Sequence, residues 1–242
     1  MVRFSPDPTG RLRQRTYYTE QELDREFETL LEAFFGRLER AVVYPLETED
    51  LIRLIEERTS DFDQYGDLDE EGIDVEGVTR FRRLEKPDVI ISARLSEDGR
   101  RSNRFRTTLA HEFGHVHLHD PLVQETLAHA ESNMLRDGTI LQKIVCHRDS
   151  ITDAKAVDWM EWQACYASGA ILMPRRAVRN LLEPFHRSID RLPGPMWQGE
   201  PQAEAMIETV RDGFRVSQEA ASVRLRVLGH LVKDRPAASL FD

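Results

Sequence analysis

The segment DWMEWQACYASGAILMP, Asp158 to Pro174, is the strongest constraint on the fold of this chain. If Asp158 caps a helix that ends at Pro174, apolar side chains lie almost all round that helix. Such a helix is buried, so the rest of the chain must pack around it. Glu161 is the one acid inside it, and a buried carboxylate stays ionised beside a counter-charge or a metal ion. An ion pair between Glu161 and an arginine is the alternative.

The stretch LAHEFGHVHLHD contains an HExxH pattern at residues 111–115. On a helix, residues four apart lie on the same face, so His111 and His115 can bind one zinc ion together. Glu112 follows the first ligand and can contact a water molecule beside the metal. The pattern alone is a modest signal, and the alternative is a surface helix whose histidines have this spacing by chance.

The other residues of this stretch have different expected roles. His119 would lie about 12 Å along the helix axis from His111, too far to share one ion, so we expect it to support a ligand or to cap the helix. His117 points away from the ligand pair and is expected to be structural or exposed. Gly114 costs helix stability but leaves space for another backbone to approach.

A third ligand must come from a different segment. Leu118 and Pro121 stand where the extended metzincin motif has Gly and His. The acidic candidates after the motif are Glu125, Glu131, Asp137, Asp149, Asp153, Asp158 and Glu161. Glu161 is favoured, because its helix is the one expected to be buried.

The region before the motif is expected to hold one long helix and a small sheet. Residues 1–18 are interpreted as a flexible arm. Thr19 and Glu22 form a capping box at the start of an amphipathic helix. The acidic stretch DFDQYGDLDEEG, residues 61–72, is interpreted as a surface loop. Two strands follow, the second over residues 89–95.

Residues 176–242 are expected to form a helical C-terminal region. Residues 203–213 and 217–228 are predicted to be helices around a short turn, an arrangement that resembles a helix-turn-helix. Lysines and arginines of this region could contact DNA: Arg211, Arg215, Arg224, Arg226, Lys233 and Arg235. The alternative is a helical bundle that packs on the rest of the chain.

Composition excludes several classes of protein. An apolar share of 40% with 31% charged residues is typical of a folded, soluble chain, and a net charge of −10 argues against non-specific nucleic-acid binding by the whole surface. The N-terminus lacks the apolar segment of a signal peptide, and no apolar run reaches the roughly 18 residues that span a bilayer. The two cysteines, Cys146 and Cys165, fit a reducing compartment. We therefore expect a cytoplasmic protein with no membrane partner.

Two blocks of the chain resemble the ImmA/IrrE family of metallopeptidases. RFRTTLAHEFGHVHLH, residues 104–119, is similar to that family's entry to its active helix and the histidine that follows the motif. MEWQACYASGAILMP, residues 160–174, looks like its second helix, with the ligand Glu near the start. A weaker block, FRVSQEAASVRLRVLG, residues 214–229, resembles the segment that commonly follows. The blocks occur in the expected order, and the likeness covers most of residues 40–175.

The resemblance implies an α+β fold and a hydrolytic metal site. Residues 19–175 would form a zincin peptidase domain of the gluzincin kind, with a small β-sheet beside the HExxH helix, followed by the helical C-terminal extension. One Zn²⁺ per chain would be held by His111, His115 and Glu161. Glu112 would act as the general base of a zinc metalloendopeptidase.

A hydrogen-bond donor for the developing oxyanion should accompany this machinery. His119 and Tyr166 are both candidates, and the sequence does not choose between them. The chain departs from many relatives at Gln163, where they have Glu, and at Cys165, where they have Asn. The first departure makes Glu161 the clear choice of ligand, and the second removes a contact that Asn would make.

The resemblance also implies a protein substrate. Members of the family typically cut helix-turn-helix transcriptional repressors, often encoded nearby, in mobile elements or stress responses. The strand over residues 89–95 is expected to offer its edge to such a substrate in an extended conformation. The competing hypothesis is a regulator that binds DNA or a repressor and has a structural or inactive metal site.

Overall fold

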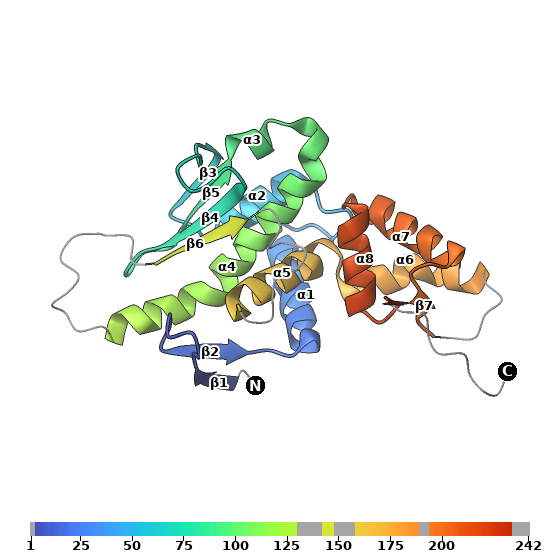
Figure 1. Cartoon of the computed structure of the whole chain (residues 1–242), viewed down its shortest axis with the longest axis horizontal. Coiled ribbons are helices and arrows are strands. Elements are labelled where there is room, and N and C mark those ends of the chain that lie inside the picture. Colours follow the sequence, from blue (N-terminus) through green and yellow to red (C-terminus); the bar gives the residue numbers. More distant parts are fainter. Residues whose placement is uncertain (1–2, 130–141, 148–157, 189–193, 234–242) are drawn as a thin grey trace.

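The computed structural model of the chain describes residues 3–129, 142–147, 158–188 and 194–233. It is a mixed α+β structure in which helices pack against small sheets (Figure 1), in agreement with the fold class expected from the sequence. The helices are α1 (Glu20–Arg37), α2 (Thr48–Glu56), α3 (Ala93–Ser96), the 3-10 turn η1 (Gly99–Arg101), α4 (Ser102–His129), α5 (Trp159–Leu172), α6 (Arg175–Ser188), α7 (Pro201–Phe214) and α8 (Gln218–Val227). The strands are β1 (Arg3–Pro6), β2 (Gln14–Tyr17), β3 (Asp61–Gly66), β4 (Val75–Phe81), β5 (Asp88–Ser92), β6 (Gln142–His147), β7 (Met196–Trp197) and β8 (Leu231–Val232).

The N-terminal segment is a docked hairpin, so the prediction of a flexible arm over residues 1–18 is wrong for residues 3–17. β1 and β2 pair antiparallel, and the connection between them buries Leu12 against the core. The backbone oxygen of Thr16 accepts a hydrogen bond from Gln163 Nε2 at 2.9 Å. Arg11 forms a two-bond ion pair with Asp158 at the start of α5. Strands of four residues show no clear periodicity, and these long-range contacts hold the hairpin in place.

The main sheet has four strands in the order β3-β5-β4-β6. β3 runs parallel to β5, and the other two pairs are antiparallel. The interpretation of residues 61–72 as a loop is wrong at its start, because 61–66 form the edge strand β3. The second predicted strand is shorter than expected: β5 ends at Ser92, and Leu95 is buried on the short helix α3.

The helix that carries the HExxH motif lies beside α5 (Figure 1). A Cβ atom at Gly114 of α4 would lie 2.8 Å from Ala167 Cβ and 3.1 Å from Ala164 Cα. Real side-chain atoms do not pack this tightly against a neighbouring backbone, so glycine is what permits the two helices to approach. The expected role of Gly114 is confirmed.

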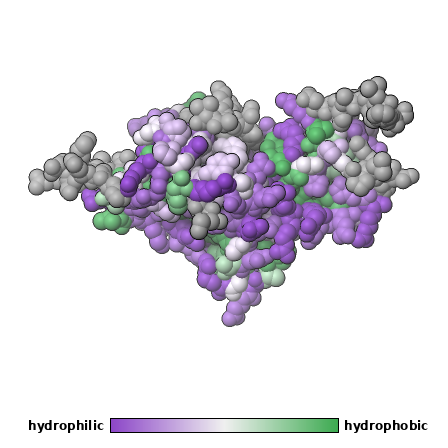
Figure 2. Space-filling view, turned by 90° about the horizontal axis from the view of Figure 1, so that it is seen from below, coloured by the Kyte–Doolittle hydropathy of each residue, from purple (hydrophilic) through white to green (hydrophobic). Residues whose placement is uncertain are grey.

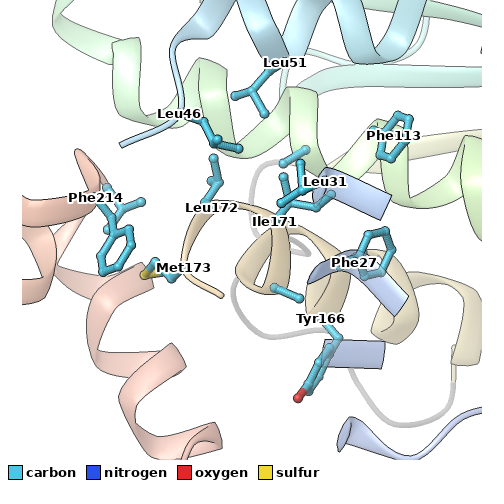
Figure 3. Close-up of a cluster of buried hydrophobic side chains, with 14 of the residues drawn as sticks. Phe27, Leu31, Leu46, Leu51, Phe113, Tyr166, Ile171, Leu172, Met173 and Phe214 are labelled. Atoms are coloured by element: carbon cyan, nitrogen blue, oxygen red, sulfur yellow. The ribbon is translucent and has the colours of Figure 1, made fainter. Parts of the chain in front are cut away.

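One large hydrophobic cluster joins the helices on both sides of residue 175 (Figure 3). Leu172 and Met173, at the end of α5, lie between Phe27 and Leu31 of α1 and Phe214 of α7. The C-terminal helices therefore share their core with the rest of the described chain. Within the described ranges, no helix combines the length and the apolar character that crossing a membrane requires.

A buried charge cluster fastens the C-terminal helices to α1. Asp24 of α1 accepts hydrogen bonds from Arg224 Nη2 at 2.6 Å and from Arg175 Nε at 2.7 Å. Arg224 Nε also donates to the backbone oxygen of Met173 at 2.9 Å. Asp24 and Arg224 are each 3% exposed. Removal of one partner from such a buried pair is strongly destabilising, because it leaves an uncompensated buried charge.

Four arginines of the possible DNA-binding set have partners within the described part of the chain. Arg224 is buried in the charge cluster, and Arg226 donates to Gln198 at 3.1 Å. Arg211 pairs with Asp212, and Arg215 pairs with Glu47. Arg235 lies outside the described residues. The helices α7 and α8 pack on the rest of the described chain through the shared hydrophobic cluster, as the bundle alternative expected.

Candidate metal centre

Three side chains from two helices meet between α4 and α5. The Nε2 atoms of His111 and His115 lie 3.0 Å apart. Glu161 of α5 places Oε1 3.3 Å from His115 Nε2 and Oε2 3.4 Å from His111 Nε2. Both histidines are fully buried, and the possible ligand atoms of the three residues lie within 4.8 Å of one another.

These distances fit the donor set of a single metal ion. In a tetrahedral zinc site with bonds of about 2.0–2.2 Å, neighbouring ligand atoms are separated by about 3.3 Å. Two imidazole nitrogens and a carboxylate are a common ligand set of catalytic zinc. The group His111, His115 and Glu161 could therefore hold a metal ion.

Local sequence places Glu161 where it meets the histidines. The Asp158 side chain accepts hydrogen bonds from the backbone N–H groups of Met160 and Glu161, which starts α5 as the sequence predicted. Burial acts to raise the pKa of Glu161, but His115 and His111 outweigh it and hold that pKa below its usual range. Within the described ranges no arginine forms an ion pair with Glu161, so the alternative partner is not observed.

The other acidic candidates do not join this group. Asp158 pairs with Arg11, and Glu125 accepts a hydrogen bond from Gln14. The four remaining candidates, at positions 131, 137, 149 and 153, lie outside the described residues.

Glu112 lies fully buried between α4 and strand β4. Its Oε2 accepts a hydrogen bond from Thr79 Oγ1 at 2.5 Å. A Cβ atom at Gly77 would overlap the Glu112 carboxylate, so glycine leaves the space that this side chain fills. Burial raises the pKa of Glu112 above its ordinary value, although the neighbouring histidines oppose this.

Sequence reasoning did not identify Gly77 and Thr79 as part of the site. The available signal was a glycine inside a predicted strand, which often marks the close approach of another group. Their partner Glu112 is 33 residues from Thr79 in sequence. The contact therefore depends on how the sheet packs on α4, and a short stretch of sequence does not predict that packing.

A hydrogen-bond chain supports His115 from behind. His119 Nε2 lies 3.1 Å from Gln163 Oε1, and Gln163 Nε2 donates to the backbone oxygen of Thr16. Because the amide oxygen can only accept, His119 must donate from Nε2. Burial lowers the pKa of His119 well below its ordinary value, so its Nδ1 is left as an acceptor. His115 Nδ1, 3.0 Å away, then donates to it, which leaves the lone pair of His115 Nε2 for a metal ion.

His119 thus supports a ligand, as expected. Its two ring nitrogens are hydrogen-bonded to Gln163 and His115, so neither can donate to an oxyanion. His117 is directed elsewhere, to Glu26 Oε1 at 2.8 Å, as the sequence suggested.

Tyr166, the other candidate for an oxyanion donor, lies away from the group of His111, His115 and Glu161. It follows Glu161 by five residues, which turns it about 140° away around the helix. The guanidinium carbon of Arg224 lies 5.4 Å from its ring centre, beside the Asp24 cluster. The periodicity of an almost wholly apolar helix could not tell which face meets the metal.

The pKa of Tyr166 predicts a loss of stability in alkaline solution. Burial raises this pKa to about 12, whereas tyrosine in an unfolded chain ionises near pH 10. Between these values the unfolded state releases a proton that the folded state keeps, so stability is full below about pH 10 and falls as pH rises towards 12. Urea denaturation across this window should show that the free energy of unfolding falls less steeply with pH for Tyr166→Phe than for the wild type. An exposed control, Tyr65→Phe, should behave as the wild type; equal slopes for all three would contradict the expectation.

A scan against models of protein families found no match for this chain, and a search of curated proteins found none either. Its function is therefore inferred from the residues and their geometry.

Proposed function

We propose that this chain is a zinc-dependent endopeptidase with a zincin domain of the gluzincin kind. The observation that carries the proposal is the convergence of His111, His115 and Glu161, with Glu112 buried beside them. A structural metal site would need the same ligands but no carboxylate next to them. The HExxH order supplies that carboxylate one residue after the first ligand.

The three ligands would hold one zinc ion per chain. When bound, zinc supplies Lewis acidity towards a peptide carbonyl and towards the attacking water. Thr79 holds Oε2 of Glu112, and Oε1 has no hydrogen-bond partner among the described residues. The Glu112 carboxylate would take the proton of the attacking water and return it to the leaving amine.

An extended peptide needs a free strand edge for main-chain pairing. β5, the strand expected to provide it, lies between β3 and β4, so that expectation is wrong. Among the described strands, β6 is the outer one on the other side of β4, the strand that carries Gly77 and Thr79. We infer that substrate pairs along β6, the neighbour of the strand whose Gly77 and Thr79 contact Glu112.

The substrate that we propose is a helix-turn-helix repressor whose gene lies near the gene of this chain. We propose that both proteins are cytoplasmic. The support for this substrate is the resemblance of residues 104–119 and 160–174 to the ImmA/IrrE metallopeptidases.

Incubation of the purified, zinc-loaded chain with that repressor should give defined fragments, identified by mass spectrometry. Chelation should stop the cleavage, and zinc should restore it. If the repressor stays intact after incubation with the zinc-loaded chain, the proposed substrate is wrong. If the zinc-loaded chain also fails to cleave unfolded proteins, the proposed peptidase activity is wrong.

A further inference from the structure

A hollow of about 190 Å³ lies between the N-terminal hairpin and α5. Four aromatic side chains form most of its wall, Tyr17, Tyr18, Trp159 and Trp162. Trp159 and Gln163, also in the wall, each lie two residues from Glu161, so they project about 160° away from it around α5. The hollow is thus on the far side of α5 from the metal centre. The hairpin side of the molecule, seen in Figure 2, is otherwise mainly hydrophilic.

Two polar groups at this hollow lack the partners that such groups normally have. Thr16 is buried, and its Oγ1 has no hydrogen-bond partner within the described part of the chain. Arg15 donates from Nε to Ser5 Oγ at 3.3 Å, but none of the described carboxylates forms an ion pair with it. Buried polar atoms are almost always hydrogen-bonded, so the Thr16 hydroxyl is an unfilled hydrogen-bonding position. Arg15, which is half-buried, offers a guanidinium without a carboxylate partner among the described residues.

The wall defines the chemistry of an occupant. Aromatic side chains favour a planar ring, which stacks on them or meets their edges. Arg15 favours a carboxylate or similar anion, because its planar guanidinium matches that shape. The volume is below the roughly 300 Å³ at which pockets for drug-sized ligands begin, so it suits a molecule of one or two rings.

We propose that this hollow binds a small planar aromatic anion and that its occupancy is transmitted to the metal centre. The connection is the hydrogen-bond chain Thr16–Gln163–His119–His115, whose first and second members line the hollow. A ligand that holds Thr16 and Gln163 in place keeps His119 aligned with His115, so it strengthens metal binding. The binding site stands independently, and its link to the metal rests on the proposed function.

Benzoate is a suitable probe. Benzamide is the matched compound that lacks the charge, and cyclohexanecarboxylate is the matched compound whose ring is neither planar nor aromatic. Titration of the metal-free chain, followed by calorimetry and by fluorescence, should show binding of benzoate in preference to both. Two of the three tryptophans line the hollow, so their fluorescence should change. Arg15→Gln should weaken benzoate binding by about fivefold or more, because a charge-assisted hydrogen bond is lost. Arg13→Gln, a neighbouring arginine outside the wall, is the matched control and should bind as the wild type.

Equal binding of the three probes, or equal weakening by both arginine variants, would overturn the site. Its link to the metal is measured by zinc affinity with and without saturating benzoate, using a competing chelator. We expect zinc to bind about fivefold tighter or more with benzoate, and benzoate to bind tighter with zinc by the same factor. Zinc affinity that benzoate leaves unchanged would overturn the link. A chain that binds benzoate but no zinc would reject the proposed function and leave the hollow as a ligand site.

Discussion

Glu112→Gln is expected to lower kcat/KM for peptide hydrolysis by about 10²- to 10⁴-fold, the range for loss of a general base, while zinc stays bound. Glutamine keeps the shape of the side chain and can still accept the Thr79 hydrogen bond, but its amide cannot take a proton from water. The ligands His111, His115 and Glu161 are untouched. Cleavage rates and zinc content should be measured on the same preparation, because the expectation is that only the first changes.

The matched control is Glu70→Gln, which makes the same chemical change at an exposed acid. It should retain wild-type activity and zinc. If Glu112→Gln cleaves as fast as this control, Glu112 is not the base. If it loses zinc together with activity, its carboxylate holds the site together instead of moving a proton.

Asp24→Ala is expected to lower the free energy of unfolding by about 3–5 kcal/mol, the cost of leaving a buried charge without its partner. Arg224 is 3% exposed and has Asp24 as its carboxylate partner. Without Asp24, its charge would remain among Met173 and the apolar side chains of α5 and α8. Urea denaturation followed by circular dichroism measures this change.

Two further variants separate the buried pair from a general effect of losing an acid. Asp212→Ala removes an exposed partner of Arg211 and should cost less than about 1 kcal/mol, as surface ion pairs do. The double variant Asp24→Ala with Arg224→Met should be more stable than Asp24→Ala alone, because no buried charge is left unpaired. A cost for Asp24→Ala as small as that of Asp212→Ala would show that the cluster does not fasten the C-terminal helices.

Features with short-range causes could be predicted from the sequence. Thr19 and Glu22 form the capping box at the start of α1, and Asp158 caps α5. The HExxH spacing placed two imidazoles on one face of α4 because four residues are about one helical turn. Because apolar side chains lie almost all round α5, its one acid, Glu161, was predicted to be buried and therefore to need a partner.

Features that depend on distant contacts could not be predicted. β2 is held by Gln163, almost 150 residues away, and its own four residues show no pattern. β3 alternates between exposed and partly buried positions within an acidic run, so its composition favoured a loop. Asp24 is one acid in an amphipathic helix, and only the packing of α8 makes it a buried partner of Arg224.

Elemental analysis of the purified chain, combined with the affinity for added zinc, tests the central claim most directly. We expect one zinc ion per chain in the wild type, and its loss in His115→Ala and in Glu161→Ala with the helical content retained. His117→Ala, on the same helix but directed to Glu26, should keep the metal. Zinc that binds the Glu161→Ala variant as tightly as the wild type, or a folded wild-type chain that binds none, would contradict the convergence of α4 and α5 on one ion.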